Sequence, residues 1–262
     1  LVGSEMCIRD SSYTNDKEAK QTFKHTFKNE RVTAKISLQK QDKETKKAVP
    51  QGDATLEKAV YGLYARADIV HPDGATGVVY KAGEQVATLT TDKNGQASVD
   101  GLYLGNYYVK EITPPTGYLA DEEEHDLVCN YEGDLVAEVK RDCLSLEQVM
   151  KQPFQIIKAA NNGKTDADLL KGAGFTAYLV SSLKVNEDGS YDFDSAKPVV
   201  IGENSATEIF TDEKGYACSI AIPYGTYIVR ETTTPHNYTP VDDFIVQLSL
   251  IHISEPTRPI SI

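Results

Sequence analysis

Two stretches of this chain, residues 105–118 and 225–238, repeat one pattern at a constant spacing of 120 positions. The shared residues are Gly105/Gly225, Tyr107/Tyr227, Val109/Val229, Glu111/Glu231, Pro115/Pro235 and Tyr118/Tyr238. The same spacing aligns the Thr-Asp-x-x-Gly segment at 91–95 with the one at 211–215. An internal repeat of this length indicates tandem copies of one domain. We therefore expect two domains of one fold, each with a glutamate at the end of the repeated element.

The two ends of the chain resemble translated adaptor DNA. One DNA sequence that encodes residues 248–258 has a reverse complement that encodes residues 1–10 when the reading frame is shifted by one base. This relation is typical of a sequencing-library adaptor read through at both ends of an insert, so both ends are set aside from the fold. The predicted organisation is adaptor at 1–10, the end of a preceding repeat at 11–30, a domain at 31–147, a second domain at 148–247 that stops before its last strand, and adaptor at 248–262.

The rest of the chain has the pattern of an all-β protein. Short alternating segments are separated by Gly, Pro, Asn and Asp, and long helical runs are few, which favours β-sandwich domains. Strands are predicted at 33–40, 60–65, 86–90, 97–102, 106–112, 126–131 and 135–141, and in the second copy at 154–159, 174–179, 207–211, 217–222, 226–231 and 244–247. One or two helical turns are predicted at 144–152, between the two copies.

Composition and motifs argue against several classes of function. The net charge of −12 disfavours nucleic-acid binding, which needs a basic face. No apolar run is long enough to span a membrane, so no membrane insertion is expected. The chain has no recognisable catalytic fingerprint, so we expect neither an enzyme nor a cofactor. The Asp92–Gly95 segment resembles the start of a calcium loop, but the twelfth position is Tyr103, so a tight turn and no metal are expected.

Cysteine usage does not indicate a disulfide framework. Cys7 falls in the adaptor, which leaves Cys129, Cys143 and Cys218, an odd number. A hairpin that turns near residues 132–134 would not bring Cys129 opposite Cys143. We expect buried free thiols.

Strand periodicity places one lysine and one glutamate on the inward face of each domain. Alternate residues of a strand share a face. The sets that share a face are Ile36, Leu38 and Lys40; Tyr107, Val109 and Glu111; Phe154, Ile156 and Lys158; and Tyr227, Val229 and Glu231. Inward charges are unfavourable unless they are paired. The pattern alone leaves two interpretations open, a buried ion pair and a reactive site.

The repeated element also resembles a known family. Residues 107–118, Tyr-Tyr-Val-Lys-Glu-Ile-Thr-Pro-Pro-Thr-Gly-Tyr, resemble the E-box of the Cna B-type, or SpaA-like prealbumin-fold, domains of Gram-positive surface proteins. Residues 36–42 resemble the first strand of that family, and 59–64 and 174–178 resemble the second strand. The second copy departs from the pattern at Asn237, where the family usually has Gly, so an altered turn is expected there. The resemblance implies tandem Greek-key, immunoglobulin-like (prealbumin-like) β-sandwiches.

The resemblance also implies an intramolecular isopeptide bond. In this family a buried lysine amine attacks the side chain of an Asn or Asp on the last strand, and the glutamate shuttles protons. Burial favours the neutral, nucleophilic form of a lysine, and the fold supplies proximity. By resemblance, Lys40 and Glu111 have these roles in the first domain, and Lys158 and Glu231 have them in the second.

The acceptor residues are less clearly marked. Asp142 is the predicted acceptor of the first domain, although it shares the parity of Glu138 and Lys140 and would face outward unless a bulge resets the register. Asn130 is the second choice. In the second domain the acceptor is expected beyond Gln247, and Asn29 is the predicted acceptor of a preceding domain.

The function implied by the resemblance is structural. We expect a stalk segment of a cell-wall-anchored adhesin or pilin-like protein on the surface of a Gram-positive bacterium, with neighbouring repeats of the same chain as partners. The alternative is a binding module that contacts a host protein or glycan through loops such as 70–81 or 181–205.

Overall fold

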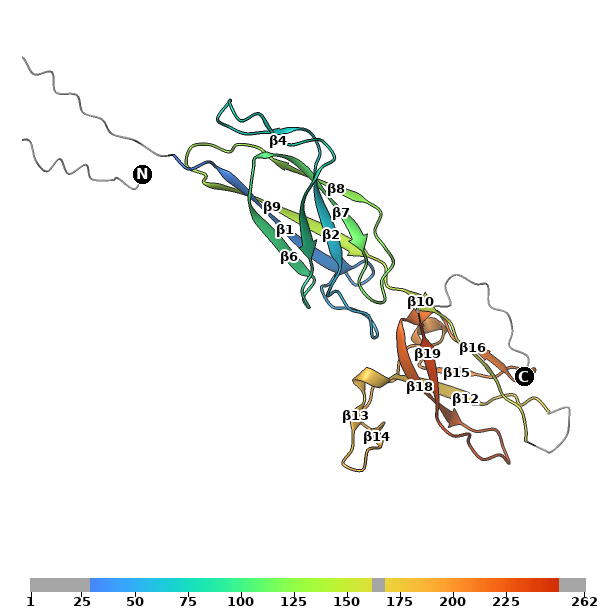
Figure 1. The fold of residues 1–262 in the computed structure, drawn as a ribbon. Helices are drawn as coiled ribbons and strands as arrows, with labels where there is room; N and C mark the ends of the chain where they lie inside the picture. Colours follow the sequence, from blue (N-terminus) through green and yellow to red (C-terminus); the bar gives the residue numbers. More distant parts are fainter. Residues whose placement is uncertain (1–28, 162–167, 250–262) are drawn as a thin grey trace, which may run out of the picture. The chain divides into compact units, whose positions relative to one another are not determined.

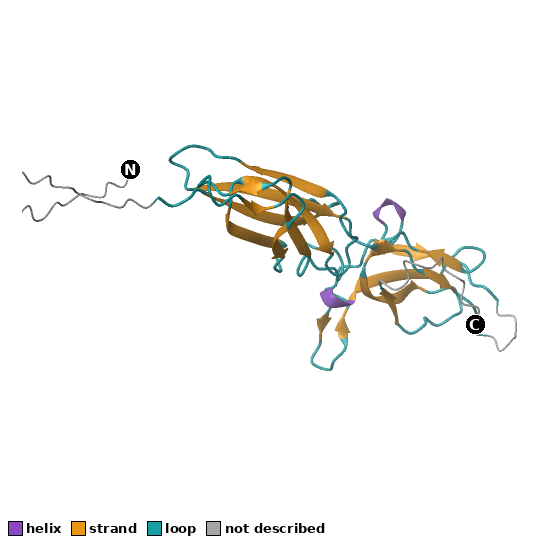
Figure 2. Ribbon diagram, turned by 45° about the horizontal axis from the view of Figure 1, so that its top comes forward, coloured by secondary structure: helices purple, strands orange, loops and turns teal. Residues whose placement is uncertain are grey.

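The computed structural model describes residues 29–161 and 168–249, and almost all of its regular structure is β-strand (Figures 1 and 2). The all-β prediction is confirmed. None of the helices in this described part is long and apolar enough to cross a membrane. Within the described residues two short 3-10 helices occur, η1 (Val180–Ser182) and η2 (Glu203–Ser205).

The first repeat contains two larger sheets that enclose a hydrophobic core, and a short two-stranded hairpin. Its strands are β1 (Thr33–Asp42), β2 (Val60–Ala65), β3 (Ile69–Val70), β4 (Val78–Tyr80), β5 (Gln85–Thr90), β6 (Gln96–Leu102), β7 (Gly105–Thr113), β8 (Glu124–Cys129) and β9 (Glu138–Glu147). One sheet has the order β5-β2-β7-β8 and the other the order β6-β1-β9. Inward residues of both sheets, such as Ile36, Leu63 and Val109, form one buried cluster. Packing of two inner faces in this way is typical of a β-sandwich.

The second repeat has the same central sheet and a separate core. Its strands are β10 (Lys151–Gln152), β11 (Gln155–Ile157), β12 (Gly174–Leu179), β13 (Lys184–Val185), β14 (Tyr191–Asp192), β15 (Glu208–Phe210), β16 (Tyr216–Cys218), β17 (Ile222–Pro223), β18 (Gly225–Thr233) and β19 (Phe244–Leu248). The order β15-β12-β18-β19 matches β5-β2-β7-β8 of the first repeat. Phe175, Val229 and Ile222 belong to its own hydrophobic cluster.

The first and last strands of the first repeat are neighbours, and they run parallel. β1 pairs with β9 from Thr33↔Glu138 to Asp42↔Glu147 without a break in register. The predicted helical turns at 144–152 are therefore wrong, because the parallel pairing continues β9 to Glu147. The alternation of Cys143, Ser145 and Glu147, which are all buried, fits a strand with one face on the core.

The repeated Thr-Asp-x-x-Gly segment is a tight turn that packs on the strand carrying the lysine. Asp92 Oδ1 accepts hydrogen bonds from the backbone N–H groups of Asn94 and Gln96. Gly95 has a φ of +71°, and its carbonyl accepts the N–H of Lys40 at 2.8 Å. In the second repeat, Gly215 accepts the N–H of Lys158 at 2.7 Å. The turn therefore fixes the backbone of each lysine.

Replacing Gly95 with alanine is expected to lower the free energy of unfolding of the first repeat by about 1–3 kcal/mol. The positive φ is unfavourable for alanine, and its Cβ would lie 2.8 Å from the carbonyl oxygen of Lys40. Gly74→Ala is the matched control, because Gly74 has a φ of +68° with no atom within 4 Å of the added Cβ. Denaturant unfolding of both variants measures the difference, and equal losses would mean that close packing against Lys40 is unimportant.

Asn237 keeps the turn that the family pattern assigns to Gly. Its φ is +70°, close to the +86° of Gly117, and Tyr238 N–H donates to Pro235 O as Tyr118 N–H donates to Pro115 O. The expected alteration of this turn is wrong, because asparagine tolerates the left-handed conformation. The tyrosines that follow do differ, since Tyr118 is buried and Tyr238 is 45% exposed.

Candidate functional site

Lys40 is the centre of a buried polar cluster in the first repeat. Its side chain lies on the inward face of β1, in line with Ile36 and Leu38, and is completely buried. Lys40 Nζ lies 3.0 Å from Glu111 Oε1 on β7, and it donates to the hydroxyl of Tyr61 on β2 at 3.0 Å. Nζ also contacts Oε1 of Glu147 on β9. Three strands from both sheets therefore present polar atoms to one amine.

Glu147 is held beside this amine by β9 and by Tyr61. In the parallel register Lys40 is level with Ser145, so Glu147, two residues on, shares the inward face and reaches Nζ diagonally. Tyr61 donates a hydrogen bond of 2.6 Å to Glu147 Oε1. Glu147 Oε2 is buried, and no residue of the described part hydrogen-bonds to it. A buried carboxylate oxygen without a donor is unfavourable.

Glu111 is fixed by the chain that follows β7. Its Oε2 accepts the backbone N–H of Asp121 at 2.8 Å, while its Oε1 faces Lys40. Tyr61 and Glu111 are directly paired in the β2–β7 ladder. The glutamate is therefore oriented from both sides.

The surroundings change the acidity of the reacting groups. Burial lowers the pKa of Lys40 from 10.5 to about 8, although the nearby carboxylate of Glu111 partly opposes this effect. A larger fraction of neutral amine, which is the nucleophilic form, is then present near pH 7. Burial also raises the pKa of Tyr61, so its hydroxyl keeps its proton.

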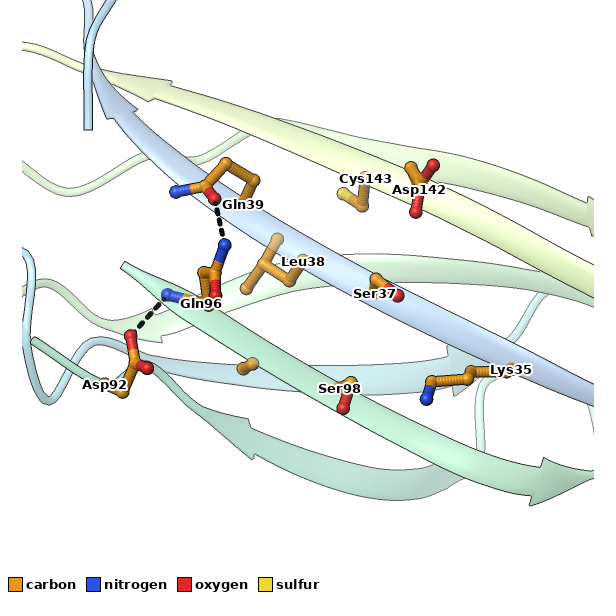
Figure 3. Close-up of a pocket in the computed structure, with 10 residues that line it drawn as sticks. Lys35, Ser37, Leu38, Gln39, Asp92, Gln96, Ser98, Asp142 and Cys143 are labelled. Atoms are coloured by element: carbon orange, nitrogen blue, oxygen red, sulfur yellow. Dashed lines mark hydrogen bonds between the residues drawn. The ribbon is translucent and has the colours of Figure 1, made fainter. Parts of the chain in front are cut away.

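The structure brings Lys40 and Glu111 together, but it does not place Asp142 beside them. Asp142 is exposed and level with Ser37. Together with Ser37 and Ser98 it lines a depression on the β6-β1-β9 sheet (Figure 3). The β1–β9 register has no bulge, so the side chain of Asp142 points outward, away from Lys40. The prediction that Asp142 is the acceptor does not fit this geometry.

Asn130 is also remote from Lys40. It is exposed and follows Cys129, which pairs with Gly105 at the opposite end of the β7–β8 ladder from Glu111. Six residues of extended strand correspond to about 20 Å.

Sequence reasoning missed Glu147 and Tyr61. The signal for Glu147 is the alternation of Cys143, Ser145 and Glu147, but the sequence analysis predicts helical turns at 144–152 and so does not continue the last strand to Glu147. Tyr61 stood in the segment that resembles the second strand, but its hydroxyl was not connected with the lysine.

The second repeat contains the corresponding lysine and glutamate. Lys158 Nζ lies 2.7 Å from Glu231 Oε2, which also accepts the N–H of Val241. Glu231 Oε1 is buried and has no hydrogen-bond partner among the described residues. Phe175 pairs with Glu231 as Tyr61 pairs with Glu111, so this site has no hydroxyl at the equivalent position.

The remaining predicted residues lie apart from these clusters. Asn29 is exposed in the chain before β1, and the rest of the segment at 11–28 lies outside the described residues. Cys129 and Cys143 are buried free thiols as predicted, whereas Cys218 is exposed, and Cys7 lies outside the described residues. Burial raises the pKa of Cys143 to about 11, so its thiol is unreactive near pH 7. No group of three metal-ligating side chains occurs within residues 29–161 and 168–249.

The chain resembles several proteins of known structure. The chain resembles the Bacillus anthracis TIE protein, with 22% identity and a TM-score of 0.50, over 82% of this chain and 31% of that one. It thus spans less than a third of that protein. It also matches a streptococcal ancillary pilin (22% identity, TM-score 0.32, 86% of this chain and 61% of that one) and the shaft pilin SpaA from Lactobacillus rhamnosus GG (18% identity, TM-score 0.32, 83% and 94%).

A search of curated protein sequences found no match. The family model of the SpaA prealbumin-like fold domain matches residues 34–142 and again residues 153–252. These two matches cover most of the chain and coincide with the two repeats. The chain therefore belongs to the SpaA prealbumin-like fold domain family and contains two copies of that domain.

Proposed function

We propose that this chain is a structural stalk segment of a cell-wall-anchored surface protein of a Gram-positive bacterium, in which an isopeptide bond between Lys40 and Glu147 locks the first domain. The observation that carries this proposal is the buried contact of Lys40 Nζ with Glu147, beside Glu111. Glu147 takes the place of Asp142 and Asn130 as acceptor, because its carboxylate reaches the amine. A stalk segment acts as a structural element and turns over no substrate.

The reaction joins two side chains that the fold already holds together. The amine of Lys40 attacks Cδ of Glu147, and one water leaves. Glu111 accepts a proton from the amine and returns it to the departing oxygen, which is general acid–base catalysis. Proximity in the folded domain replaces an external catalyst.

The second domain is proposed to react in the same way through Lys158 and Glu231. Their distance of 2.7 Å and their burial support it. Its acceptor remains the prediction made from the sequence, beyond Gln247. The role of Asn29 as acceptor of a preceding domain also remains a prediction.

The stalk role follows from which strands the bond would join. β1 and β9 are the first and last strands of the first domain, so a force on its ends would pass through covalent bonds. A row of such domains would resist stretching and proteolysis without an oxidising environment. Its partners would be neighbouring repeats of the same chain. The segment at 70–81 contains most of the short hairpin β3–β4, and the segment at 181–205 contains the hairpin β13–β14; binding of a host protein or glycan there remains the alternative.

Intact mass measurement of the full chain tests the bond. Relative to the mass that each sequence requires, the parent chain is expected to weigh one water less than Lys40→Ala and Glu147→Ala, whatever the second domain contributes. Glu147→Gln is expected to lose one ammonia instead, because its amide would be the acceptor. Asp142→Ala is the control and should still lose one water. A parent of full mass would leave Lys40 in a buried ion cluster and would remove the basis of the proposal.

The pH dependence of stability gives a second test, with the variant Glu147→Met. This variant cannot form the bond, so Lys40 remains a buried amine, and burial keeps its folded pKa below the 10.5 of the unfolded chain. Between these values the unfolded chain binds more protons, so stability rises with pH, by up to about 1.4 kcal/mol per pH unit. Denaturant unfolding between pH 7 and pH 9 should show this rise relative to the two control chains.

The parent and Glu147→Gln are the controls, since in both Lys40 would be an amide that does not titrate. The range ends at pH 9 because, above that pH, the thiol of Cys143 ionises in the unfolded chain but keeps its proton in the folded chain, where burial raises its pKa to about 11, and this lowers stability as pH rises. The same rise in the parent would mean that its Lys40 is a free amine.

A further inference from the structure

Among the described residues that contact Lys40, only Tyr61 has a hydroxyl that hydrogen-bonds to both Lys40 and Glu147. Tyr61 Oη accepts from Lys40 Nζ at 3.0 Å and donates to Glu147 Oε1 at 2.6 Å. It therefore connects the incoming nitrogen with an oxygen of the acceptor. The ring is completely buried, so bulk water does not compete for these contacts.

We infer that Tyr61 is a further catalytic residue of the bond-forming reaction, which carries a proton from Lys40 Nζ to the departing Oε1 of Glu147 and adapts the first domain to a carboxylate acceptor. This inference rests on the proposed function. It assigns to Tyr61 a role separate from that of Glu111.

The proton balance shows why a second route is needed. In the starting ion pair Lys40 Nζ carries three protons and the Glu147 carboxylate has none. The Nζ–Cδ bond forms and the Cδ–Oε1 bond breaks, so that the amide keeps one proton and Oε1 leaves as water with the other two. Glu111 transfers one of them. Tyr61 transfers the second, since Oη takes a proton from Nζ and gives its own to Oε1, and both residues end as they began.

An amide acceptor would need one proton fewer on its leaving group, because it departs as ammonia. One proton route can then suffice. The second domain shows that the fold does not require the hydroxyl, since Phe175 occupies the position of Tyr61 and pairs with Glu231 in the same register. The phenol is therefore a feature of the site that contains Glu147.

Tyr118 provides a matched control for the removal of a buried hydroxyl. Its ring is also completely buried and lies near Lys40, with Nζ 5.9 Å from the ring centroid. Its hydroxyl, however, donates to Asp42 at 3.0 Å and not to the reacting atoms. Tyr118→Phe should therefore leave bond formation unchanged.

The test follows bond formation in the full chain during cell-free synthesis. Samples are quenched in acidic denaturant, and intact mass gives the fraction that has lost water or ammonia. Protease resistance of parallel samples gives the folded fraction, so that the rate is counted in folded chains only. Tyr61→Phe is expected to form the bond at least about 100-fold more slowly than the parent, the range found for general acid–base groups.

The same substitution in the Glu147→Gln background is expected to slow ammonia loss by less than about tenfold, which a purely structural role would not produce. Equal slowing with both acceptors, or an unchanged rate in Tyr61→Phe, would overturn the role of Tyr61. Tyr61→Met is a second variant without a hydroxyl and should behave as Tyr61→Phe does. A parent chain that loses no water would instead overturn the proposed function, so the two failures are distinguishable.

Discussion

Replacing Glu147 with methionine is expected to lower the free energy of unfolding of the first domain by about 4–5 kcal/mol. The bond between Lys40 and Glu147 closes a loop of roughly 100 residues, and a cross-link of that span restricts the unfolded chain by about this amount. Methionine has a similar volume and leaves the 3.0 Å ion pair of Lys40 with Glu111 in place. The loss therefore reports the cross-link and leaves no unpaired lysine.

Hydrogen exchange measured by mass spectrometry can assign this loss to one domain. Peptides from β7 should exchange faster in Glu147→Met, whereas peptides from β18 in the second domain should not change. Glu147→Gln is the control, because it is expected to form the same bond and to retain the protection of the parent. Faster exchange in Glu147→Gln as well would mean that the carboxylate, and not the cross-link, stabilises the domain.

Much of the fold could be predicted because turn residues mark the ends of its strands, and because the strands that carry Lys40 and Glu111 alternate between more and less buried residues. β2 (Val60–Ala65) and β12 (Gly174–Leu179) begin and end as predicted. β7 and β18 extend one or two residues further at each end than predicted. The inward lysine and glutamate followed from the same alternation, since a buried strand face fixes which side chains meet.

The acceptor could not be predicted because it depends on pairing between the two ends of the first domain. Leu144, Leu146 and Val149 have a spacing that fits a short helix as well as a strand. The parallel ladder with β1 decides between them, and this contact joins residues about 100 positions apart. Tyr61 was visible in the sequence, but its role required the pairing that places it opposite Glu111 and within hydrogen-bond distance of Glu147.

Because β1 and β9 are parallel neighbours at the two ends of the first domain, a bond between them should strongly change how the domain responds to force. A force applied to the two ends of the chain enters the first domain at Thr33 and leaves it after Glu147. If Lys40 and Glu147 are bonded, the force passes along β1 to Lys40, crosses the bond and continues from Glu147. The roughly 100 residues between them then carry no load and cannot be extended.

Stretching single molecules of the full chain in an atomic force microscope should therefore give different records for two variants. Glu147→Met is expected to show an additional unfolding event that lengthens the chain by about 350 Å, the extended length of roughly 100 residues. Glu147→Gln is expected to lack this event, as is the parent. The second domain is identical in all three chains and provides the reference events in each record. An additional event of this length in the parent would show that no covalent bond joins β1 to β9, because only an open loop can be drawn out under force.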